Sequence, residues 1–150
     1  MPKIARISKS PADTADIAQD FLKHLEGVKP ASKKAIVVGL YGELGAGKTT
    51  FTIAAGKAFK IKRKLNSPTF VIMKRYALKH KTFNNLFHLD AYRLKKVKEL
   101  LHLGWKEIIA DPKNIIFIEW PEKVAKAMPK KHHKIKISHT KEGHRHFKLS

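Results

Sequence analysis

The chain contains no cysteine among its 150 residues, so disulfide bonds and thiolate chemistry are excluded. It also has no apolar run that approaches the ~20 residues a membrane-spanning helix needs. Its N-terminal stretch carries no apolar core of the kind found in secretion signals. These absences predict a soluble cytoplasmic protein, and the length predicts one domain over residues 1–150.

Acidic residues are scarce: 12 Asp and Glu stand against 32 Lys and Arg, which gives a formal net charge of +20. None lies between Glu43 and Asp90, a stretch that is rich in lysine. This charge predicts attraction to polyanions, and to nucleic acid first among them. Because lysine is a point charge and not a bidentate donor, attraction to the nucleic-acid backbone is favoured over base-specific readout. A solvated, lysine-rich surface without a function is the alternative, and the sequence leaves both open.

A phosphate-binding loop is the clearest motif in the chain. The spacing G-x-x-x-x-G-K-[ST] is met by Gly42, Gly47, Lys48 and Thr49. A β-branched apolar run at 35–40 precedes the loop, and residues 49–59 after it favour a helix. This strand–loop–helix context is the one that the motif requires, and it argues against an ordinary glycine turn.

The chemistry of such a loop defines which residues bind nucleotide. Backbone N–H groups and the positive end of the following helix bind the phosphates of a nucleoside triphosphate. Lys48 can reach the β- and γ-phosphates, and the Thr49 hydroxyl can ligate magnesium. The predicted binding residues of the loop are Gly42, Glu43, Leu44, Gly45, Ala46, Gly47, Lys48, Thr49 and Thr50.

Two carboxylates at predicted strand ends are candidates for the rest of the site. Glu119 follows the apolar run 115–118, where a second magnesium ligand or a water-ordering group is expected, and a surface glutamate is the alternative. Asp90 ends another strand and can orient water or assist magnesium, with an ion pair to Arg93 as the alternative. The predicted catalytic residues are Lys48, Asp90 and Glu119, and the predicted metal ligands are Thr49 and Glu119.

Other side chains are weaker candidates. Thr69 follows a proline and resembles a switch threonine that senses the γ-phosphate, against an ordinary turn threonine. Trp120 can stack on a base, although a large aromatic is more often partly buried core. The C-terminal histidines fit no standard zinc spacing and are interpreted as basic surface: His132, His133, His139, His144 and His146.

The pattern along the chain predicts a single-domain α/β, P-loop NTPase-like fold with a mixed sheet flanked by helices. A first strand is expected at 3–7, and a helix from Ser10-Pro11 to Gly27. The sheet is expected to be parallel at its centre and antiparallel where hairpins join it. The remaining expected elements are a hairpin of 70–76 with 83–88, helices at 95–103 and 105–109, and a closing hairpin that turns at Gly143.

In sequence order, these motifs resemble the TsaE (YjeE) family, the small bacterial P-loop ATPases of tRNA threonylcarbamoyladenosine synthesis. Four segments carry the resemblance: 42–51, Ser67-Pro68-Thr69-Phe70, residues 88–94 (HLDAYRL) and residues 118–122 (IEWPE). Glu99, Leu100 and Gly104 also match the family's helix between them. The resemblance runs from about Thr14 to the final hairpin.

The resemblance implies a magnesium-dependent ATPase that hydrolyses ATP to ADP and phosphate, slowly without its partners. It places Lys48 at phosphate, Thr49 and Glu119 at magnesium, and Asp90 in the catalytic centre. Thr14 would lie near the base of the nucleotide. The family often has arginine after the glycine of the last turn; here His144 takes that position, with Arg145 next to it as the alternative.

The resemblance also implies a partner, the TsaD–TsaB pair, which transfers the threonylcarbamoyl group to the adenosine beside the anticodon. ATP hydrolysis would reset or license that machinery, and tRNA would be contacted indirectly or through the basic surface. Two other hypotheses remain. One is a small-molecule kinase, for which Arg63 and Arg75 offer little basis for a lid; the other is a non-catalytic RNA-binding P-loop module, suggested by the charge.

Overall fold

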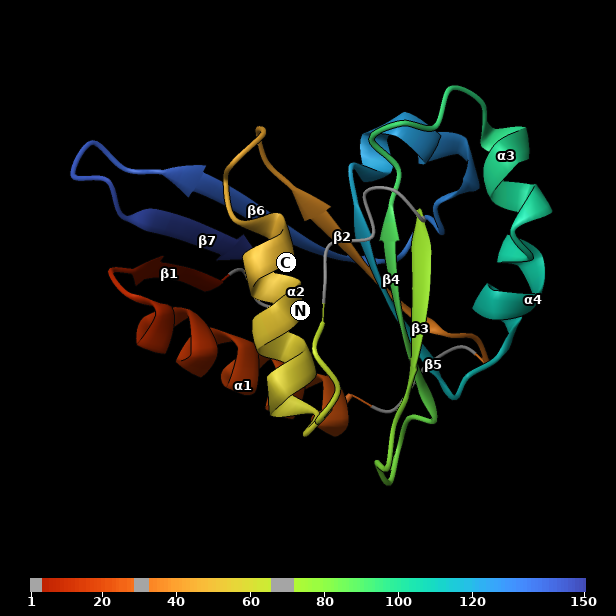
Figure 1. Ribbon diagram of the computed structural model, residues 1–150, viewed down its shortest axis with the longest axis horizontal. Coiled ribbons are helices and arrows are strands. Elements are labelled where there is room, and N and C mark those ends of the chain that lie inside the picture. The colour runs from red at the N-terminus through yellow and green to blue at the C-terminus, as the bar shows by residue number, and fades with distance from the viewer. Residues whose placement is uncertain (1–3, 29–32, 66–71) are drawn as a thin grey trace.

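A single seven-stranded sheet runs through the computed structural model, which describes residues 4–28, 33–65 and 72–150 (Figure 1). Its strand order is β1-β7-β6-β2-β5-β4-β3. The four central strands β6, β2, β5 and β4 are parallel, whereas β7, β1 and β3 join antiparallel. The predicted mixed sheet is therefore confirmed. The strands are β1 (Ile4–Ser8), β2 (Ile36–Tyr41), β3 (Met73–Ala77), β4 (Asn85–Asp90), β5 (Asn114–Glu119), β6 (His133–His139) and β7 (Arg145–Leu149).

Helices cover both faces of the sheet. They are α1 (Pro11–Gly27), α2 (Lys48–Ala58), α3 (Val97–His102), α4 (Trp105–Ala110) and the 3₁₀ helix η1 (Pro121–Ala127). Figure 1 shows α1 and α2 side by side at one part of the sheet, with α3 and α4 on the far side of β5. No helix in the described ranges has the length and apolar character needed to cross a membrane.

Two hydrophobic cores lie on the two faces of the sheet. In β5, Ile115 and Phe117 face the core formed with α1 and α2, while Ile116 and Ile118 face the core formed with α3, α4 and η1. A central parallel strand is buried on both faces, which explains why it reads as a continuous apolar run. The two cores hold the carboxyl ends of β4 and β5 in fixed positions next to the loop after β2.

Local signals in the sequence set most element ends. Ser10 accepts a hydrogen bond from the backbone N–H of Asp13 at 3.1 Å, and Pro11 opens α1, as predicted. The helix ends at Gly27, also as predicted. Gly104, with a φ of 86°, separates α3 from α4 because this left-handed backbone is unfavourable for other residues.

Two features depart from the expected elements or cannot be compared with them. The 3₁₀ helix η1 was not expected; it begins at Pro121, directly after Trp120, whose φ is 58°. The first hairpin is present as β3 and β4, and its first strand begins at Met73. The predicted start at Phe70 and the switch candidate Thr69 lie outside the described residues.

Candidate nucleotide-binding site

The loop between β2 and α2 is built around glycines. Gly45 and Gly47 have φ values of 79° and 109°, which side-chain-bearing residues rarely adopt. A Cβ on Gly42 would lie 2.6 Å from the carbonyl oxygen of Ile137, so β6 approaches the loop too closely for any side chain there. The conformation and the close approach both explain the glycine spacing that the motif demands.

Lys48, the first residue of α2, lies against the inside of this loop. Its Nζ donates hydrogen bonds to the carbonyl oxygens of Gly42 and of Glu43, the latter at 3.1 Å. The ammonium also lies 3.8 Å from the centre of the Trp120 ring. Burial lowers the pKa of Lys48, and the nearby carboxylates oppose that shift. The lysine is thus held at the loop by groups that a phosphate oxygen can replace.

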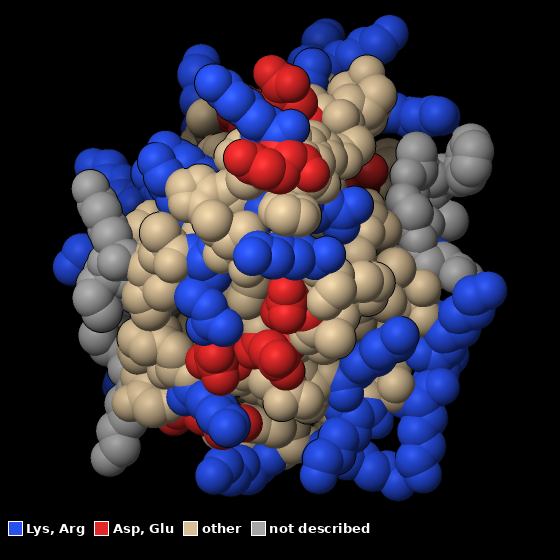
Figure 2. Space-filling view, turned by 90° about the vertical axis from the view of Figure 1, so that its left-hand side faces the viewer, with Lys and Arg blue, Asp and Glu red and all other residues tan. Residues whose placement is uncertain are grey.

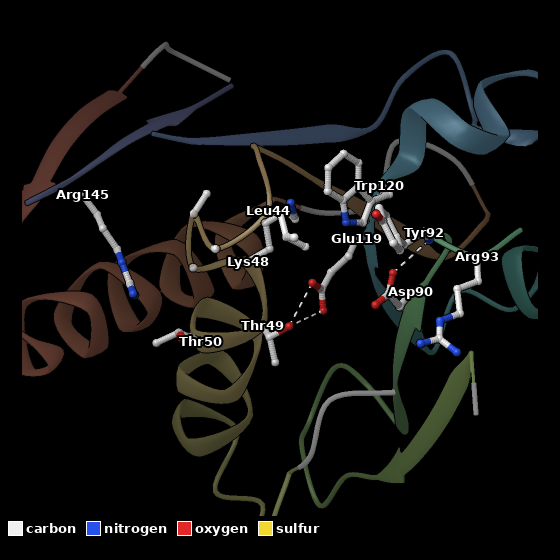
Figure 3. A pocket seen from close by; sticks show the side chains of 13 residues that line it. Leu44, Lys48, Thr49, Thr50, Asp90, Tyr92, Arg93, Glu119, Trp120 and Arg145 are labelled. Carbon is white, nitrogen blue, oxygen red and sulfur yellow. Dashed lines mark hydrogen bonds between the residues drawn. The ribbon is translucent and has the colours of Figure 1, made fainter. Parts of the chain in front are cut away.

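A hydroxyl and a carboxylate meet beside the loop. The Thr49 Oγ1 donates to both carboxylate oxygens of Glu119 at 2.9 Å, and Figure 3 shows the two side chains pointing toward one another. On the other side, Nε2 of the fully buried His88 lies 2.6 Å from Oε2 of Glu119. Hydroxyl and carboxylate oxygens form the hard donor set that magnesium prefers. These two residues therefore fit a magnesium site.

Asp90 ends the strand next to Glu119 and lies opposite it in the register of β4 and β5. One of its carboxylate oxygens, Oδ1, accepts a hydrogen bond from the backbone N–H of Tyr92 at 2.9 Å. Burial raises the pKa of this carboxyl, and the negative charge of Glu119 adds to the shift. Asp90 is consequently a buried carboxylate fixed at the edge of the pocket and coupled to a second one.

Seven of the nine predicted loop residues and both carboxylates line one pocket of about 420 Å³, whereas Gly42 and Glu43 do not line it. Its wall includes the loop from Leu44 to Thr50, and Asp90 and Glu119. Four further residues also line it: Trp120, which was a weaker candidate, Arg145, which was the alternative to His144, and Tyr92 and Arg93, which were not predicted to bind nucleotide. In Figure 3, Arg145 approaches the loop from the side opposite to Asp90. The pocket therefore has the two carboxylates and Arg93 at one end and Arg145 at the other.

A second pocket of about 230 Å³ continues from the first past Thr50 and Arg145, which line both. Thr14 lines it too, with its hydroxyl 2.6 Å from the hydroxyl of Ser8. His144 lines neither pocket, and its backbone N–H donates to the Thr140 hydroxyl. A Cβ on Gly47 would lie 2.7 Å from Nη1 of Arg145, so the arginine, one residue after the predicted histidine, contacts the loop.

The family model described as "Threonylcarbamoyl adenosine biosynthesis protein TsaE" matches residues 8–147 of the chain. The chain belongs to the TsaE family. The matched range contains the phosphate loop, Asp90, Glu119 and Arg145, so the pocket lies wholly within the part of the chain that defines membership.

Relatives named tRNA threonylcarbamoyladenosine biosynthesis protein TsaE occur in distant bacteria. The Haemophilus influenzae protein is 34% identical over 68% of this chain and 62% of its own length, and the Bacillus subtilis protein 35% identical over 71% and 63%. The Aquifex aeolicus protein is 33% identical over 78% of this chain and 76% of its own. The chain thus matches less than two thirds of the Haemophilus and Bacillus proteins.

The crystal structure of YdiB from Bacillus subtilis is similar throughout. It superposes with a TM-score of 0.76 at 25% identity and covers 99% of this chain and 84% of that one. The likeness extends over nearly the whole chain, and it supports the single mixed-sheet α/β fold.

Sequence reasoning about this TsaE-family chain missed two partners of the predicted residues. His88 belongs to the motif at residues 88–94, but its contact with Glu119 depends on β4 lying next to β5. Tyr92 belongs to the same motif, and its ring lies 5.1 Å from that of Trp120 at the pocket wall. A polar residue inside an otherwise apolar predicted strand was the signal that could have identified His88.

Proposed function

We propose that this member of the TsaE family is a magnesium-dependent ATPase that supports threonylcarbamoyladenosine modification of tRNA. The observation that carries the proposal is the contact of the Thr49 hydroxyl with both oxygens of Glu119, at 2.9 Å, beside a phosphate-binding loop. The names of the relatives support the pathway. A loop that bound phosphate for structure alone would not need a hydroxyl and a carboxylate in contact beside it.

Each side chain of the pocket has a distinct task in this proposal. The backbone N–H groups of the loop and the start of α2 bind the phosphates of ATP, and Lys48 exchanges its loop carbonyls for phosphate oxygens. Thr49 and Glu119 would hold magnesium, which when bound neutralises charge on the β- and γ-phosphates. His88 keeps the Glu119 carboxylate oriented toward Thr49.

Asp90 is the group proposed to position the attacking water. Its carboxylate is fixed by the backbone of Tyr92 and faces the same pocket as Glu119. A carboxyl with a raised pKa accepts a proton more readily than an ordinary aspartate, which suits a group that orients a water nucleophile. Arg145 is proposed to contact the nucleotide on the other side of the loop, near Thr14.

A protein partner is part of the proposal, and the TsaD–TsaB pair is the one implied by family membership. Leu44 is 76% exposed and Tyr92 is 44% exposed, and both line the nucleotide pocket. Large apolar side chains at the rim of a site are suited to burial by another protein. A partner seated there would also keep bulk solvent away from the pocket while the one attacking water stays bound, so hydrolysis is expected to be slow without it.

The test is ATP hydrolysis by the purified chain, with and without the TsaD–TsaB pair and tRNA. We expect hydrolysis to rise when the pair is present and Lys48→Ala to lower it by about a hundredfold or more, since a buried cation at the phosphates is lost. Lys98→Ala, an exposed lysine on α3, is the matched control and should leave hydrolysis unchanged. Hydrolysis that stays undetectable with the pair, or that survives Lys48→Ala, contradicts the proposal.

A further inference from the structure

Another cavity lies at the opposite end of α2 from the phosphate loop. It encloses about 490 Å³ between the segment that follows α2, residues 59–63, and residues 76–79, where β3 ends. Four cations line it: Lys60, Lys62, Arg63 and Lys79. No carboxylate is among its lining residues. We call this cavity the basic groove.

The basic groove is separate from the nucleotide pocket. The two have no lining residue in common. The helix α2 has 11 residues, so its ends are about 16 Å apart at 1.5 Å per residue. A large ligand in the groove can therefore bind while ATP occupies the loop.

Arg63 is held in a defined position over an aromatic floor. Its guanidinium carbon lies 4.6 Å from the centre of the Tyr76 ring, and its Nη2 donates to the carbonyl oxygen of Arg75 at 3.2 Å. Tyr76 is itself buried, so the stack is anchored in the core. Guanidinium groups fixed in this way bind phosphate through their remaining donors and stack on bases.

The four cations of the groove have no acidic partner among the described residues. The ion pairs found there join Arg6 to Asp20, His80 to Glu26, and His88 to Glu119. Figure 2 shows Asp and Glu side chains among Lys and Arg side chains at the top and centre of the face it draws, whereas the lower right of that face carries Lys and Arg without Asp or Glu. The negative end of α2 favours a lysine such as Lys60, but that helix end does not account for Lys79, which comes from another segment.

We propose that the basic groove binds the phosphate backbone of RNA. RNA supplies several phosphates at close spacing, which matches four cations around one open cavity. A protein partner would instead bury exposed apolar anchors, and the large exposed apolar side chains of the described residues lie outside the groove: Ile4, Ile7, Leu44, Tyr92 and Leu101. The choice of tRNA as the RNA rests on the proposed function.

The test compares two double charge reversals with the same change in net charge. Lys62→Glu with Lys79→Glu alters the groove, and Lys98→Glu with Lys106→Glu alters exposed positions on α3 and α4. Binding of a tRNA transcript to the full chain is measured from 50 to 200 mM NaCl without ATP. For the groove variant we expect at least about tenfold weaker binding and a salt slope smaller by about 2, one unit per lost phosphate contact.

Controls separate the groove from general charge effects and from the ATPase. The α3/α4 variant should bind tRNA close to the unchanged chain, and Lys62→Arg with Lys79→Arg should retain binding because the charges remain. Urea unfolding checks that each variant is folded; if the charge reversal unfolds the chain, Lys62→Gln with Lys79→Gln removes the same contacts. ATP hydrolysis is measured for every variant.

Two results would overturn the proposal. One is an equal loss of tRNA binding in the groove and α3/α4 variants, which would mean that net charge alone attracts RNA. The other is unchanged tRNA binding by the groove variant with loss of its stimulation by the TsaD–TsaB pair, which would make the groove a protein contact. Absence of ATP hydrolysis together with groove-dependent tRNA binding would contradict the proposed ATPase function and leave the groove assignment intact.

Discussion

The nucleotide pocket and the basic groove both present cations for phosphate, yet they hold their charges differently. In the pocket, Lys48 and Glu119 are each about 5% exposed or less and are fixed by named hydrogen bonds. In the groove, Lys60, Lys62 and Lys79 are exposed and lack carboxylate partners among the described residues. The two sites stand at the two ends of α2.

The difference predicts how each site responds to change. A buried charged group has lost its hydrating water, so its hydrogen-bond partners must replace that water. Removing the group or one of its partners is therefore costly in free energy. An exposed lysine remains hydrated and is screened over about 10 Å at 0.1 M salt. A single conservative substitution in the pocket should therefore remove most ATP hydrolysis. RNA binding by the groove should instead weaken gradually, with each lysine that is lost and with rising salt concentration.

The largest effect is expected from Glu119→Gln, which keeps the shape of the side chain but removes its charge. Because this carboxylate contacts Thr49 at the proposed magnesium site, we expect ATP hydrolysis to fall about a hundredfold or more. The magnesium dependence of nucleotide binding should weaken in parallel. Both are measured by titrating magnesium into the chain with ATP and the TsaD–TsaB pair.

Glu122→Gln is the matched control, because Glu122 is exposed and lies three residues further along the chain. It should hydrolyse ATP like the unchanged protein. Full hydrolysis by Glu119→Gln, or an equal loss in both variants, would remove Glu119 from the metal site and weaken the contrast between buried and exposed charges.

A smaller effect, on stability, is expected from His88→Leu. The ring is fully buried and its Nε2 donates to Glu119, so an apolar replacement leaves a buried carboxylate oxygen without that donor. We expect the free energy of unfolding to fall by about 1–3 kcal/mol. Urea unfolding is the measurement, and His102→Leu, at an exposed position in α3, is the control. Equal midpoints for the two variants would show that the contact contributes no stability.

The placement of Asp90 and Glu119 at the ends of strands could be predicted from the sequence. Each follows an apolar run, and the carboxyl ends of parallel neighbouring strands meet at one edge of a sheet. Both ends of α1 could also be predicted, because Ser10-Pro11 and Gly27 carry local conformational preferences. Such features depend on the residues themselves and on the chain nearby.

The rest depends on register and on packing between distant segments. Arg145 and His144 are neighbours in the sequence, and Arg145 is the one that contacts the loop. A shift of one residue in the register of β7 would place the His144 side chain on that face instead. The sequence shows many lysines between Glu43 and Asp90, but not that the end of α2 and the end of β3 enclose a cavity. Contacts of this kind can be predicted only when the strand order and the helix packing are known.

The smallest effect is expected from His133, whose ring packs at an edge-on angle against Phe21. Burial lowers the pKa of His133 below its ordinary value of 6.5, and the nearby positive charge of His24 adds to this. The folded state therefore binds this proton less tightly than the unfolded chain does, so stability falls as the pH drops below about 6.5.

His133→Gln should make the free energy of unfolding less dependent on pH between 7 and 5. Urea unfolding at several pH values measures this, with the exposed His102→Gln as the control; the same pH dependence in both variants would mean that half-burial of this histidine does not tune its protonation.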